Sequence, residues 1–275
     1  MMTTPASPPL AGKVAIVSGS TRGVGADIAR VLSAGGARVV LLGHEADEGM
    51  ALAAELSKEL SNPGAIYCAT DIERDDEIER CIETTLARFG RLDILVNNAC
   101  IYKDRGIDSS REEWHDTLGV NLISAAIFAQ KAVPHMRRGS VIVNLGSTGG
   151  KFGAAGRALY PASKAAMLQL TKSLAVTLAP QGIRVVAVSP AWTWSPALAG
   201  MSGDSRELAD AVAAPFHPLG RVGNGAEIGN AVAFLASDAA SWITGVDLPV
   251  DGGFSILGPD RGIAPRAWFD RAEAL

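Results

Sequence analysis

The chain has 275 residues, of which 48% are hydrophobic and 20% are charged, and its formal net charge at pH 7 is -4. This composition supports a sizeable buried core and excludes an intrinsically disordered chain. The slightly acidic balance gives no electrostatic basis for binding nucleic acid or an anionic membrane.

The cysteines, the N-terminus and the hydropathy pattern limit the class of protein further. Cys68, Cys81 and Cys100 form neither a disulfide framework nor a zinc-binding pattern, so we expect a reducing, cytoplasmic environment. Residues 1–9 lack the basic and apolar segments of a signal peptide and are expected to be a disordered lead. No apolar run reaches the ~18 residues of a membrane span. The histidines lack metal-ligand spacing, so we expect no metal.

Short strands alternate with helices along most of the chain. Apolar and β-branched runs predict strands at 13–18, 38–42, 65–69, 93–96, 141–145, 183–188 and 246–250. Apolar residues at helical spacing predict helices at 26–34, 47–60, 73–89, 110–119, 122–136, 159–179 and 227–235. This alternation predicts an α/β fold with a parallel sheet covered by helices on both faces. Without internal repeats or linkers, we expect one domain at 10–254, followed by a tail at 255–275.

A glycine-rich turn lies between the first predicted strand and the first predicted helix. Gly19, Gly23 and Gly25 permit a tight turn and close approach of the backbone, and the following helix offers N–H groups to a phosphate. A plain strand-to-helix turn would show the same glycines. The position in the chain favours binding of a dinucleotide pyrophosphate.

The end of the second predicted strand bears on the choice of cofactor. A fold that binds NAD often carries an acidic residue here for the ribose 2′-hydroxyl. This chain has Gly43 instead, followed by His44, and Arg22 lies in the glycine-rich turn. These residues favour NADP(H), whereas Glu45 is an argument for NAD(H).

Polar residues and glycines follow several predicted strands. Gly19, Asp71, Asn97 and Ser147 all stand at such ends. Because the carboxyl ends of parallel strands meet at one edge of a sheet, we expect a ligand to bind beside these residues.

Ser147, Tyr160 and Lys164 are candidates for proton transfer at a carbonyl or alcohol. Tyr160 and Lys164 are four residues apart on a predicted helix and therefore share a face. An unperturbed tyrosine has a pKa of about 10, and a nearby ammonium favours the phenolate. Ser147 could hold the substrate oxygen while Tyr160 gives or takes the proton. From these residues alone, ordinary positions on a helix and a loop are an equal alternative.

The segment 192–225 is rich in small and polar residues and is a candidate lid. Aromatic and neighbouring side chains before and within it are candidates for the wall of a substrate pocket. These residues are Cys100, Tyr102, Thr148, Phe152, Trp192 and Trp194. Ordinary packing beneath a flap is the alternative. Their aromatic character favours an apolar or ring-bearing substrate.

Several motifs, in order and at compatible spacing, resemble those of the short-chain dehydrogenase/reductase family. The resemblance covers about residues 10–254. The family's TGxxxGxG motif matches 18–25, its NNAG motif matches 97–100, and its PGxVxT motif matches 190–195. Its active-site serine matches Ser147, and its YxxxK motif matches Tyr160 and Lys164. Its structural asparagine matches Asn121. The set is far more specific than any single motif.

This resemblance implies a doubly wound Rossmann fold with a seven-stranded, mainly parallel sheet and an enzyme that transfers a hydride between a nicotinamide and a ketone or secondary alcohol. Tyr160 would be the general acid/base, and Lys164 would favour its phenolate and hold the nicotinamide ribose. Ser147 would orient the substrate oxygen, and Asn121 would position a water in a proton relay.

The resemblance also implies a set of residues that hold the cofactor. Asp71 would contact the adenine, Asn98 the cofactor beside the central strand, and Ser195 the nicotinamide carboxamide. The full set is Gly19, Thr21, Arg22, Gly23, Val24, Gly25, His44, Asp71, Ile72, Asn98, Ala99, Tyr160, Lys164, Pro190, Thr193 and Ser195.

The chain departs from the family motifs at four positions. Ser18 and Ser195 replace threonine and keep a hydroxyl, whereas Ala191 and Cys100 replace glycine. No motif places a base beside Cys100, so we interpret it as pocket wall and not as a nucleophile.

Two other functions and the assembly remain open at this point. The alternatives are an NAD-dependent sugar or polyol dehydrogenase and a non-catalytic nucleotide-binding regulatory protein. The intact set of Asn121, Ser147, Tyr160 and Lys164 argues against the second. The resemblance implies a homotetramer or dimer, and Pro265–Phe269 is predicted to begin a short helix whose aromatic residues dock on a neighbouring subunit.

Overall fold

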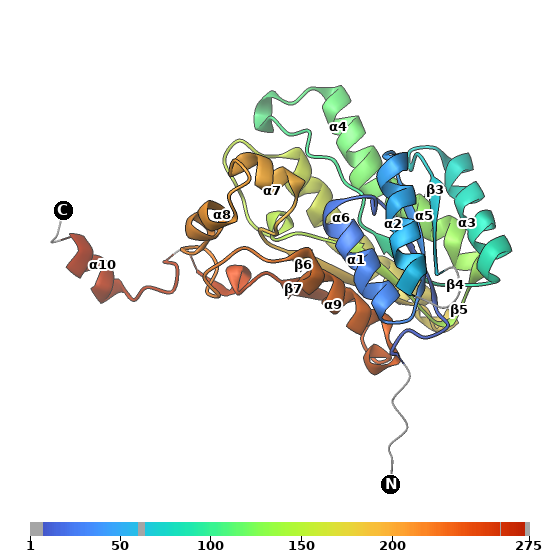
Figure 1. Cartoon of the computed structure of the whole chain (residues 1–275). Helices are drawn as coiled ribbons and strands as arrows, with labels where there is room; N and C mark the ends of the chain where they lie inside the picture. Colours follow the sequence, from blue (N-terminus) through green and yellow to red (C-terminus); the bar gives the residue numbers. More distant parts are fainter. Residues whose placement is uncertain (1–7, 60–63, 259, 273–275) are drawn as a thin grey trace, which may run out of the picture.

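The fold is a central β-sheet with helices on both faces (Figure 1). It is a computed structural model that describes residues 8–59, 64–258 and 260–272. Most of the lead expected at 1–9, and the end of the helix expected at 47–60, lie outside these residues.

The described strands and helices follow the alternation expected from the sequence. The strands are β1 Val14–Val17, β2 Arg38–Gly43, β3 Ala65–Ala69, β4 Leu92–Asn97, β5 Met136–Leu145, β6 Arg184–Pro190 and β7 Asp247–Val250. The helices are α1 Gly23–Ala34, α2 Ala46–Glu59, α3 Asp75–Phe89, α4 Arg111–Leu118, α5 Ser124–Ala132, α6 Leu159–Leu178, α7 Pro196–Met201, α8 Arg206–Ala213, α9 Gly225–Ala236 and α10 Pro265–Ala272.

The sheet has seven strands in the order β3-β2-β1-β4-β5-β6-β7, and every neighbouring pair is parallel. The order reverses between β1 and β4. This confirms the predicted doubly wound sheet, and it makes the carboxyl ends of β1 and β4 the place where a ligand of such a fold binds.

Side chains that alternate along each strand enter two separate cores. In β1, Ala15 and Val17 face a core formed with α1, α2 and α9, while Val14 and Ile16 face a core formed with α3, α5 and α6. All four are fully buried. A strand buried on both faces has a continuous apolar sequence, which is why β1 can be predicted from the sequence.

The chain between residues 119 and 145 differs from the sequence expectation. The helix expected at 122–136 ends at Ala132, because Pro134 lies in a short 3₁₀ turn, and Met136 already begins β5. Residues 137–139 of β5 are exposed, which hides the start of the strand in the sequence pattern. The break expected at Asn121 is a π-helical turn, Gly119–Ile123, whose Gly119 carbonyl accepts a hydrogen bond from Ser124 Oγ.

A buried chain of polar side chains ties α6 to two central strands. Asn97 and Asn144 are paired residues of β4 and β5, and Asn97 Nδ2 donates to Asn144 Oδ1 at 2.8 Å. Asn144 Nδ2 donates to Thr171 Oγ1 on α6 at 2.9 Å. Because buried amides must be paired, this series of hydrogen bonds fixes the position of α6 against the sheet.

Asp104 anchors the segment after β4 to the N-terminus of α6. Its carboxylate accepts hydrogen bonds from the backbone N–H groups of Ala158 at 2.9 Å and Tyr160 at 3.0 Å, and from Gly106 N at 3.0 Å. Burial alone would raise the pKa of Asp104, but these backbone donors outweigh it and hold the pKa below its usual value. The negative charge also suits the positive end of the helix.

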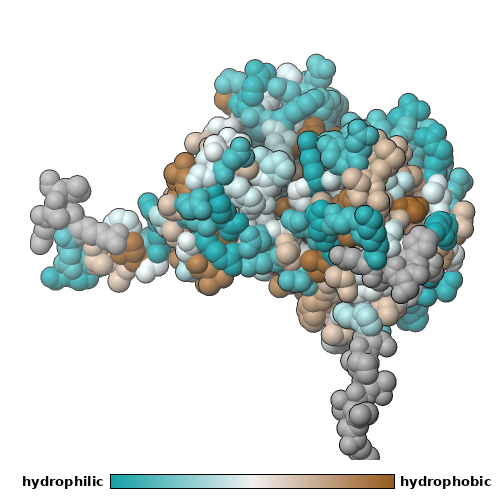
Figure 2. Space-filling model, viewed as in Figure 1, coloured by the Kyte–Doolittle hydropathy of each residue, from teal (hydrophilic) through white to brown (hydrophobic). Residues whose placement is uncertain are grey.

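The segment predicted as a lid contains α7 and α8 and has a small core of its own. Ala209, Ala213 and Val222 are buried there, with Trp194 and Leu198 packed against them. Its base is closed by the paired residues Thr193 and Gly223. Figure 2 shows hydrophobic side chains on the surface of this part of the molecule. Met201, Leu208, Val212 and Leu219 are exposed there.

The helix expected in the C-terminal tail is present as α10, which lies away from the main body (Figure 1). Phe269 is exposed on it. Among the described residues, no helix combines the length and the hydropathy that crossing a bilayer requires.

We expect Thr171→Val to destabilise the protein by about 1–3 kcal/mol, because it leaves the buried Asn144 amide without its acceptor. Thr177→Val is the matched control: Thr177 lies on the same helix but is exposed, and its hydroxyl bonds only to Ser173 O. The control should change the free energy of unfolding by less than about 0.5 kcal/mol. Urea denaturation measures both free energies of unfolding, and equal losses in the two variants would contradict the role of the buried hydrogen bonds.

We expect Asp104→Asn to lower the free energy of unfolding at pH 7 by about 1–3 kcal/mol, because the carboxylate accepts several backbone hydrogen bonds. Asp108→Asn, in the same segment but exposed, should have little effect.

The effect of Asp104→Asn should also depend on pH. The pKa of Asp104 is depressed in the folded state, so its stabilisation is present above the unfolded pKa of about 3.9 and is lost as pH falls through the lower folded value. The difference between wild type and variant should therefore shrink below about pH 4. A difference that stays constant from pH 7 to the acid limit would contradict this account.

Candidate active site

The glycine-rich turn after β1 is locked to the end of β4 by Asn98. The Asn98 side-chain amide donates to the carbonyls of Ser18 and Gly19, both at 2.9 Å. Ser18 Oγ in turn accepts from the backbone N–H groups of Asn98 at 3.0 Å and Ala99 at 3.1 Å. The serine in place of threonine therefore keeps the hydroxyl that this junction uses.

The glycines of this turn are required by backbone contacts. Gly19 has φ of 61°, and a Cβ atom there would lie 2.8 Å from Ala99 Cα. A Cβ atom on Gly25 would overlap the Gly19 carbonyl oxygen. α1 begins at Gly23 without a side-chain cap, so its first N–H groups are available to an anion. This close-packed turn with an uncapped helix start fits the pyrophosphate of a dinucleotide.

Thr21, Arg22 and Glu45 form one polar cluster at the end of β2. Thr21 Oγ1 donates to Glu45 Oε2 at 2.8 Å, and Arg22 pairs with Glu45 Oε1 at 2.9 Å. The hydrogen bond from Thr21, followed by the charge of Arg22, lowers the pKa of Glu45. The cation that the sequence offers to a 2′-phosphate is thus compensated by a carboxylate.

This cluster also requires glycine at position 43, because a Cβ atom there would lie 2.8 Å from Thr21 Oγ1. The acidic residue common at this position would displace Thr21. His44, the next residue, is exposed.

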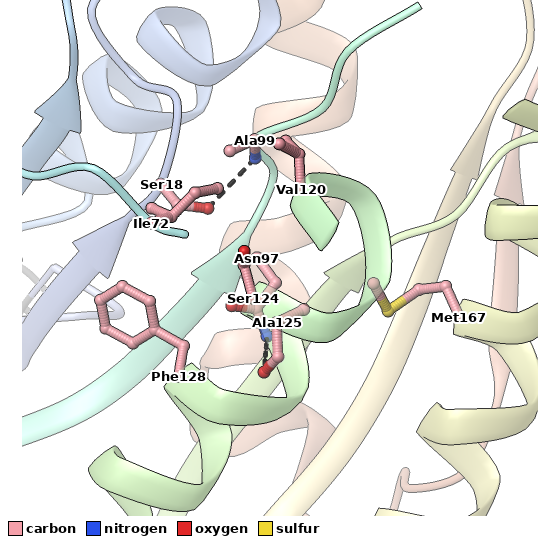
Figure 3. A pocket seen from close by; sticks show the side chains of 9 residues that line it. All are labelled: Ser18, Ile72, Asn97, Ala99, Val120, Ser124, Ala125, Phe128 and Met167. Atoms are coloured by element: carbon pink, nitrogen blue, oxygen red, sulfur yellow. Dashed lines mark hydrogen bonds between the residues drawn. The ribbon is translucent and has the colours of Figure 1, made fainter. Parts of the chain in front are cut away.

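Asp71 and Ile72 follow β3 at the same edge of the sheet. Asp71 Oδ1 accepts from Glu73 N at 3.0 Å, which holds the turn into α3. Ile72, Ser18 and Ala99 line a cavity of about 10 Å³ beneath the turn after β4 (Figure 3). A space of this size holds about one water, so it belongs to the floor of the site and not to a substrate pocket.

The structure brings Ser147 and Tyr160 together. A Cβ atom on Gly149 would lie 3.3 Å from Ser147 Oγ and 3.5 Å from Tyr160 Cε1, so both side chains border the same point. Ser147 Oγ accepts a hydrogen bond from Gly149 N at 3.0 Å. The hydroxyl proton of Ser147 is therefore left to point elsewhere.

Lys164 is buried beside Tyr160. The residue is only 2% exposed, and its Nζ lies 5.7 Å from the Tyr160 ring centroid. Nζ donates to the carbonyl of Leu145, the last residue of β5, at 2.8 Å. An ammonium has three donors, so two remain for other partners.

The Asn121 side chain binds the backbone of Ile101, the residue before Tyr102. Its Oδ1 accepts from Ile101 N at 2.8 Å, and its Nδ2 donates to Ile101 O at 3.0 Å and to Ser163 Oγ at 3.2 Å. Ser163 Oγ donates to Tyr160 O at 2.8 Å. Asn121 thus joins the turn after β4 to the first turn of α6.

The residues predicted for the substrate pocket take different positions. Tyr102 stacks on Tyr160 with ring centroids 4.9 Å apart. Phe152 meets Phe254, and Trp192 meets Phe216 and His217. Trp194 packs into the core of the 192–225 segment, with Arg206 over its ring. Thr148 is buried, and Cys100 is half-buried.

Pro190, Thr193 and Ser195 carry the chain from β6 to α7 beside the glycine-rich turn. Ser195 Oγ accepts from Leu198 N and begins α7. Pro196 Cδ lies 3.3 Å from the position of a Cβ on Gly23. The strand end, the start of the 192–225 segment and the glycine-rich turn therefore meet.

Two residues of the site were missed by sequence reasoning. Asp104 binds the N-terminus of α6, and Arg157 Cζ lies 5.2 Å from the Tyr160 ring centroid. Only the place of Arg157, three residues before Tyr160, was a signal in the sequence. Within the described ranges, no group of three or more His, Cys, Asp or Glu residues has a geometry that could hold a metal ion.

Comparisons with known proteins identify relatives over most of this chain. A family model described as enoyl-(acyl carrier protein) reductase matches residues 19–255. Cis-4-hydroxycyclohexanecarboxylate dehydrogenase of Sinomonas cyclohexanicum is 37% identical over 253 residues, which cover 90% of this chain and 98% of that protein. L-fucose dehydrogenase of Oryctolagus cuniculus is 37% identical over 258 residues, covering 91% of this chain and 88% of that protein.

A solved structure shows the same fold. It is a short-chain dehydrogenase/reductase, titled glucose/ribitol dehydrogenase, from Brucella melitensis. Its TM-score is 0.83 at 31% identity, and the match covers 90% of this chain and 99% of that one. The chain therefore belongs to the short-chain dehydrogenase/reductase family and is an NAD(P)-dependent oxidoreductase that acts on an alcohol or ketone.

Proposed function

We propose that this enzyme transfers a hydride between NADP(H) and a ketone or secondary alcohol, with Tyr160 as the general acid/base. The observation that supports this best is the grouping of Ser147 and Tyr160 around Gly149, with the Lys164 ammonium 5.7 Å from the tyrosine ring. The phenol of Tyr160 can exchange a proton with a substrate oxygen, and the neighbouring Ser147 hydroxyl can bind that oxygen.

Each side chain has one task in the proposed reaction. The bound nicotinamide supplies or accepts the hydride. Ser147 donates its hydroxyl proton to the substrate oxygen and orients it, while Tyr160 gives a proton to that oxygen in reduction and takes it in oxidation. Lys164 has two free donors for the nicotinamide ribose and lies beside the Tyr160 ring. Asn121 Oδ1 has a second lone pair for a relay water.

The residues proposed to hold the cofactor surround the glycine-rich turn. The turn and the start of α1 suit the pyrophosphate, Asp71 and Ile72 suit the adenine, and Asn98 with Ala99 suits the central part. His44 flanks the ribose side, and Pro190, Thr193 and Ser195 flank the nicotinamide side. We propose that segment 192–225, whose start touches Gly23 through Pro196, closes over the bound cofactor and substrate.

The preference for NADP(H) rests on Arg22 and on the glycine at position 43. A 2′-phosphate would have to draw Arg22 away from Glu45. That exchange is feasible because Arg22 is 65% exposed and exposed ion pairs contribute only about 0–1 kcal/mol. Glu45 is therefore proposed to moderate the preference for NADP(H) without reversing it.

The Arg22–Glu45 pair also supports the second candidate, an NAD-dependent sugar or polyol dehydrogenase. In that case Glu45 would accept a hydrogen bond from the ribose 2′-hydroxyl. One relative is named an L-fucose dehydrogenase. The first candidate is favoured because the aromatic residues Tyr102, Phe152 and Trp192 suit an apolar ring, and another relative is named for a hydroxycyclohexanecarboxylate.

The assembly and the cellular location remain proposals. We propose a cytoplasmic homo-oligomer, a tetramer or dimer, to which the exposed Phe269 of α10 contributes a contact. Light scattering of the full chain and of a chain lacking residues 262–275 would measure this contribution, and unchanged mass and activity would exclude it.

We expect Tyr160→Phe to lower kcat by about 10²- to 10⁴-fold, because the substitution removes the acid/base group and keeps the ring. Cofactor affinity, measured by nicotinamide fluorescence, should stay within about three-fold of wild type, since the other residues proposed to hold the cofactor are unchanged. Tyr102→Phe is the matched control, because it removes the neighbouring hydroxyl and keeps the stacked ring. A Tyr160→Phe enzyme that retains turnover would overturn the assignment of the base.

We expect Glu45→Gln to shift the ratio of kcat/KM values toward NADP(H) by roughly ten-fold, the effect of about 1.4 kcal/mol. The substitution removes a charge that repels a 2′-phosphate and releases Arg22 from its ion pair. Glu48→Gln removes an exposed carboxylate from the first turn of α2 and should leave the ratio unchanged. An unchanged ratio, or a shift toward NAD(H), in the Glu45 variant would contradict this account of the Arg22–Glu45 pair.

A further inference from the structure

Arg157 places a positive charge against the catalytic tyrosine. Its Cζ lies 5.2 Å from the Tyr160 ring centroid, and its side chain is exposed. Tyr102 stacks on the same ring, with centroids 4.9 Å apart. A cation over an exposed aromatic ring gains only about 0.5–1 kcal/mol. The guanidinium therefore keeps most of its capacity to bind an anion.

Among the described residues, no carboxylate pairs with Arg157. Three other cations in the segments around the site do have carboxylate partners: Lys151 pairs with Asp247 at 2.6 Å, Lys103 with Asp116 at 2.7 Å, and Arg105 with Glu113 at 3.0 Å. For Arg157, no carboxylate in the described ranges lies within ion-pair distance.

The carboxylate of Asp104, which lies near Arg157 in the same region, binds backbone N–H groups instead. Its oxygens accept from the N–H groups of Ala158, Tyr160 and Gly106. It neutralises the positive end of α6 and makes no ion pair with Arg157. A planar group with five N–H donors thus lies exposed beside the ring of Tyr160.

The backbone that carries Arg157 is braced on both sides. Ala158 is held by Asp104, and Arg157 N donates to Ala154 O at 3.3 Å. Gly156 has φ of 73°, and a Cβ atom on Gly106 would lie 2.9 Å from the Gly156 carbonyl carbon. The two segments therefore pack backbone against backbone. A braced backbone limits the positions that the guanidinium samples and favours specific binding.

We propose that Arg157 binds a carboxylate of the substrate, so that the substrate is an oxo or hydroxy acid whose reacting carbon and carboxylate are separated by a short apolar ring or chain. Arginine binds carboxylates through two parallel hydrogen bonds, which fixes orientation as well as adding affinity. Tyr102 and Tyr160 offer the aromatic surface for the intervening carbons. This inference rests on the proposed function, because it takes Tyr160 as the group that meets the reacting oxygen.

A binding experiment tests the inference without turnover. Isothermal titration calorimetry of the cofactor-loaded enzyme would compare cyclohexanecarboxylate with the neutral cyclohexanecarboxamide. Wild type should bind the acid at least about ten-fold more tightly than the amide, and Arg157→Met should lose that difference. Arg88→Met is the matched control, because Arg88 also stacks on an aromatic ring, 5.4 Å from the Phe89 centroid, but on α3. An acid-to-amide ratio that is the same in wild type and Arg157→Met would overturn the inference.

Turnover separates binding of substrate from an effect on Tyr160. With 4-oxocyclohexanecarboxylate, Arg157→Met should lower kcat/KM by roughly 10- to 100-fold, mainly through KM, while the methyl ester changes by less than about three-fold. Arg157→Lys should recover part of the loss. Equal losses on acid and ester would mean that Arg157 acts on Tyr160, which overturns the inference. Absence of turnover on both would count against the proposed function, and the calorimetric comparison would still decide the role of Arg157.

Discussion

The hydrogen bond from the buried Lys164 ammonium to the Leu145 carbonyl is the constraint on which the site depends. Removing an ammonium from water is costly unless strong acceptors replace it, so Lys164 fixes the distance between α6 and the end of β5. The same helix carries Tyr160, and the same strand leads into Ser147. The buried pair of Asn144 and Thr171 holds the two elements together further along. The residues of the proposed chemistry therefore lie on one helix and one strand that buried hydrogen bonds hold together.

Much of the fold was predictable because its strands are buried on both faces. β1 is a continuous apolar run whose residues alternate between two cores, and such a run is distinctive in a sequence. β5 was only partly predictable, since residues 137–139 near its start are exposed and resemble a loop. The π-helical turn at 119–123 has no pattern of its own, because it depends on the hydrogen bond from Ser124 to Gly119.

The positions of the candidate site residues relative to one another were predictable where they depend on residue spacing, and hidden where they depend on contacts between distant segments. Tyr160 and Lys164 are four apart on a helix, which the sequence states directly. Asp104 serves the site by accepting backbone hydrogen bonds from residues more than fifty positions away, which no local pattern records. Glu45 was visible as a charge near the second strand, but its ion pair with Arg22 and its bond with Thr21 exist only in the folded chain.

Arg22 and Arg157 show how charge compensation decides what an exposed cation can bind. Both are exposed arginines, Arg22 in the glycine-rich turn and Arg157 beside the Tyr160 ring, and composition alone treats them alike. Arg22 must exchange Glu45 for a phosphate, so its affinity for an anion is reduced by the pair it gives up. Arg157 gives up only a weak contact with an aromatic ring. An anion of equal charge therefore gains more at Arg157, which makes the substrate side of the site the stronger place for discrimination between acids and neutral molecules.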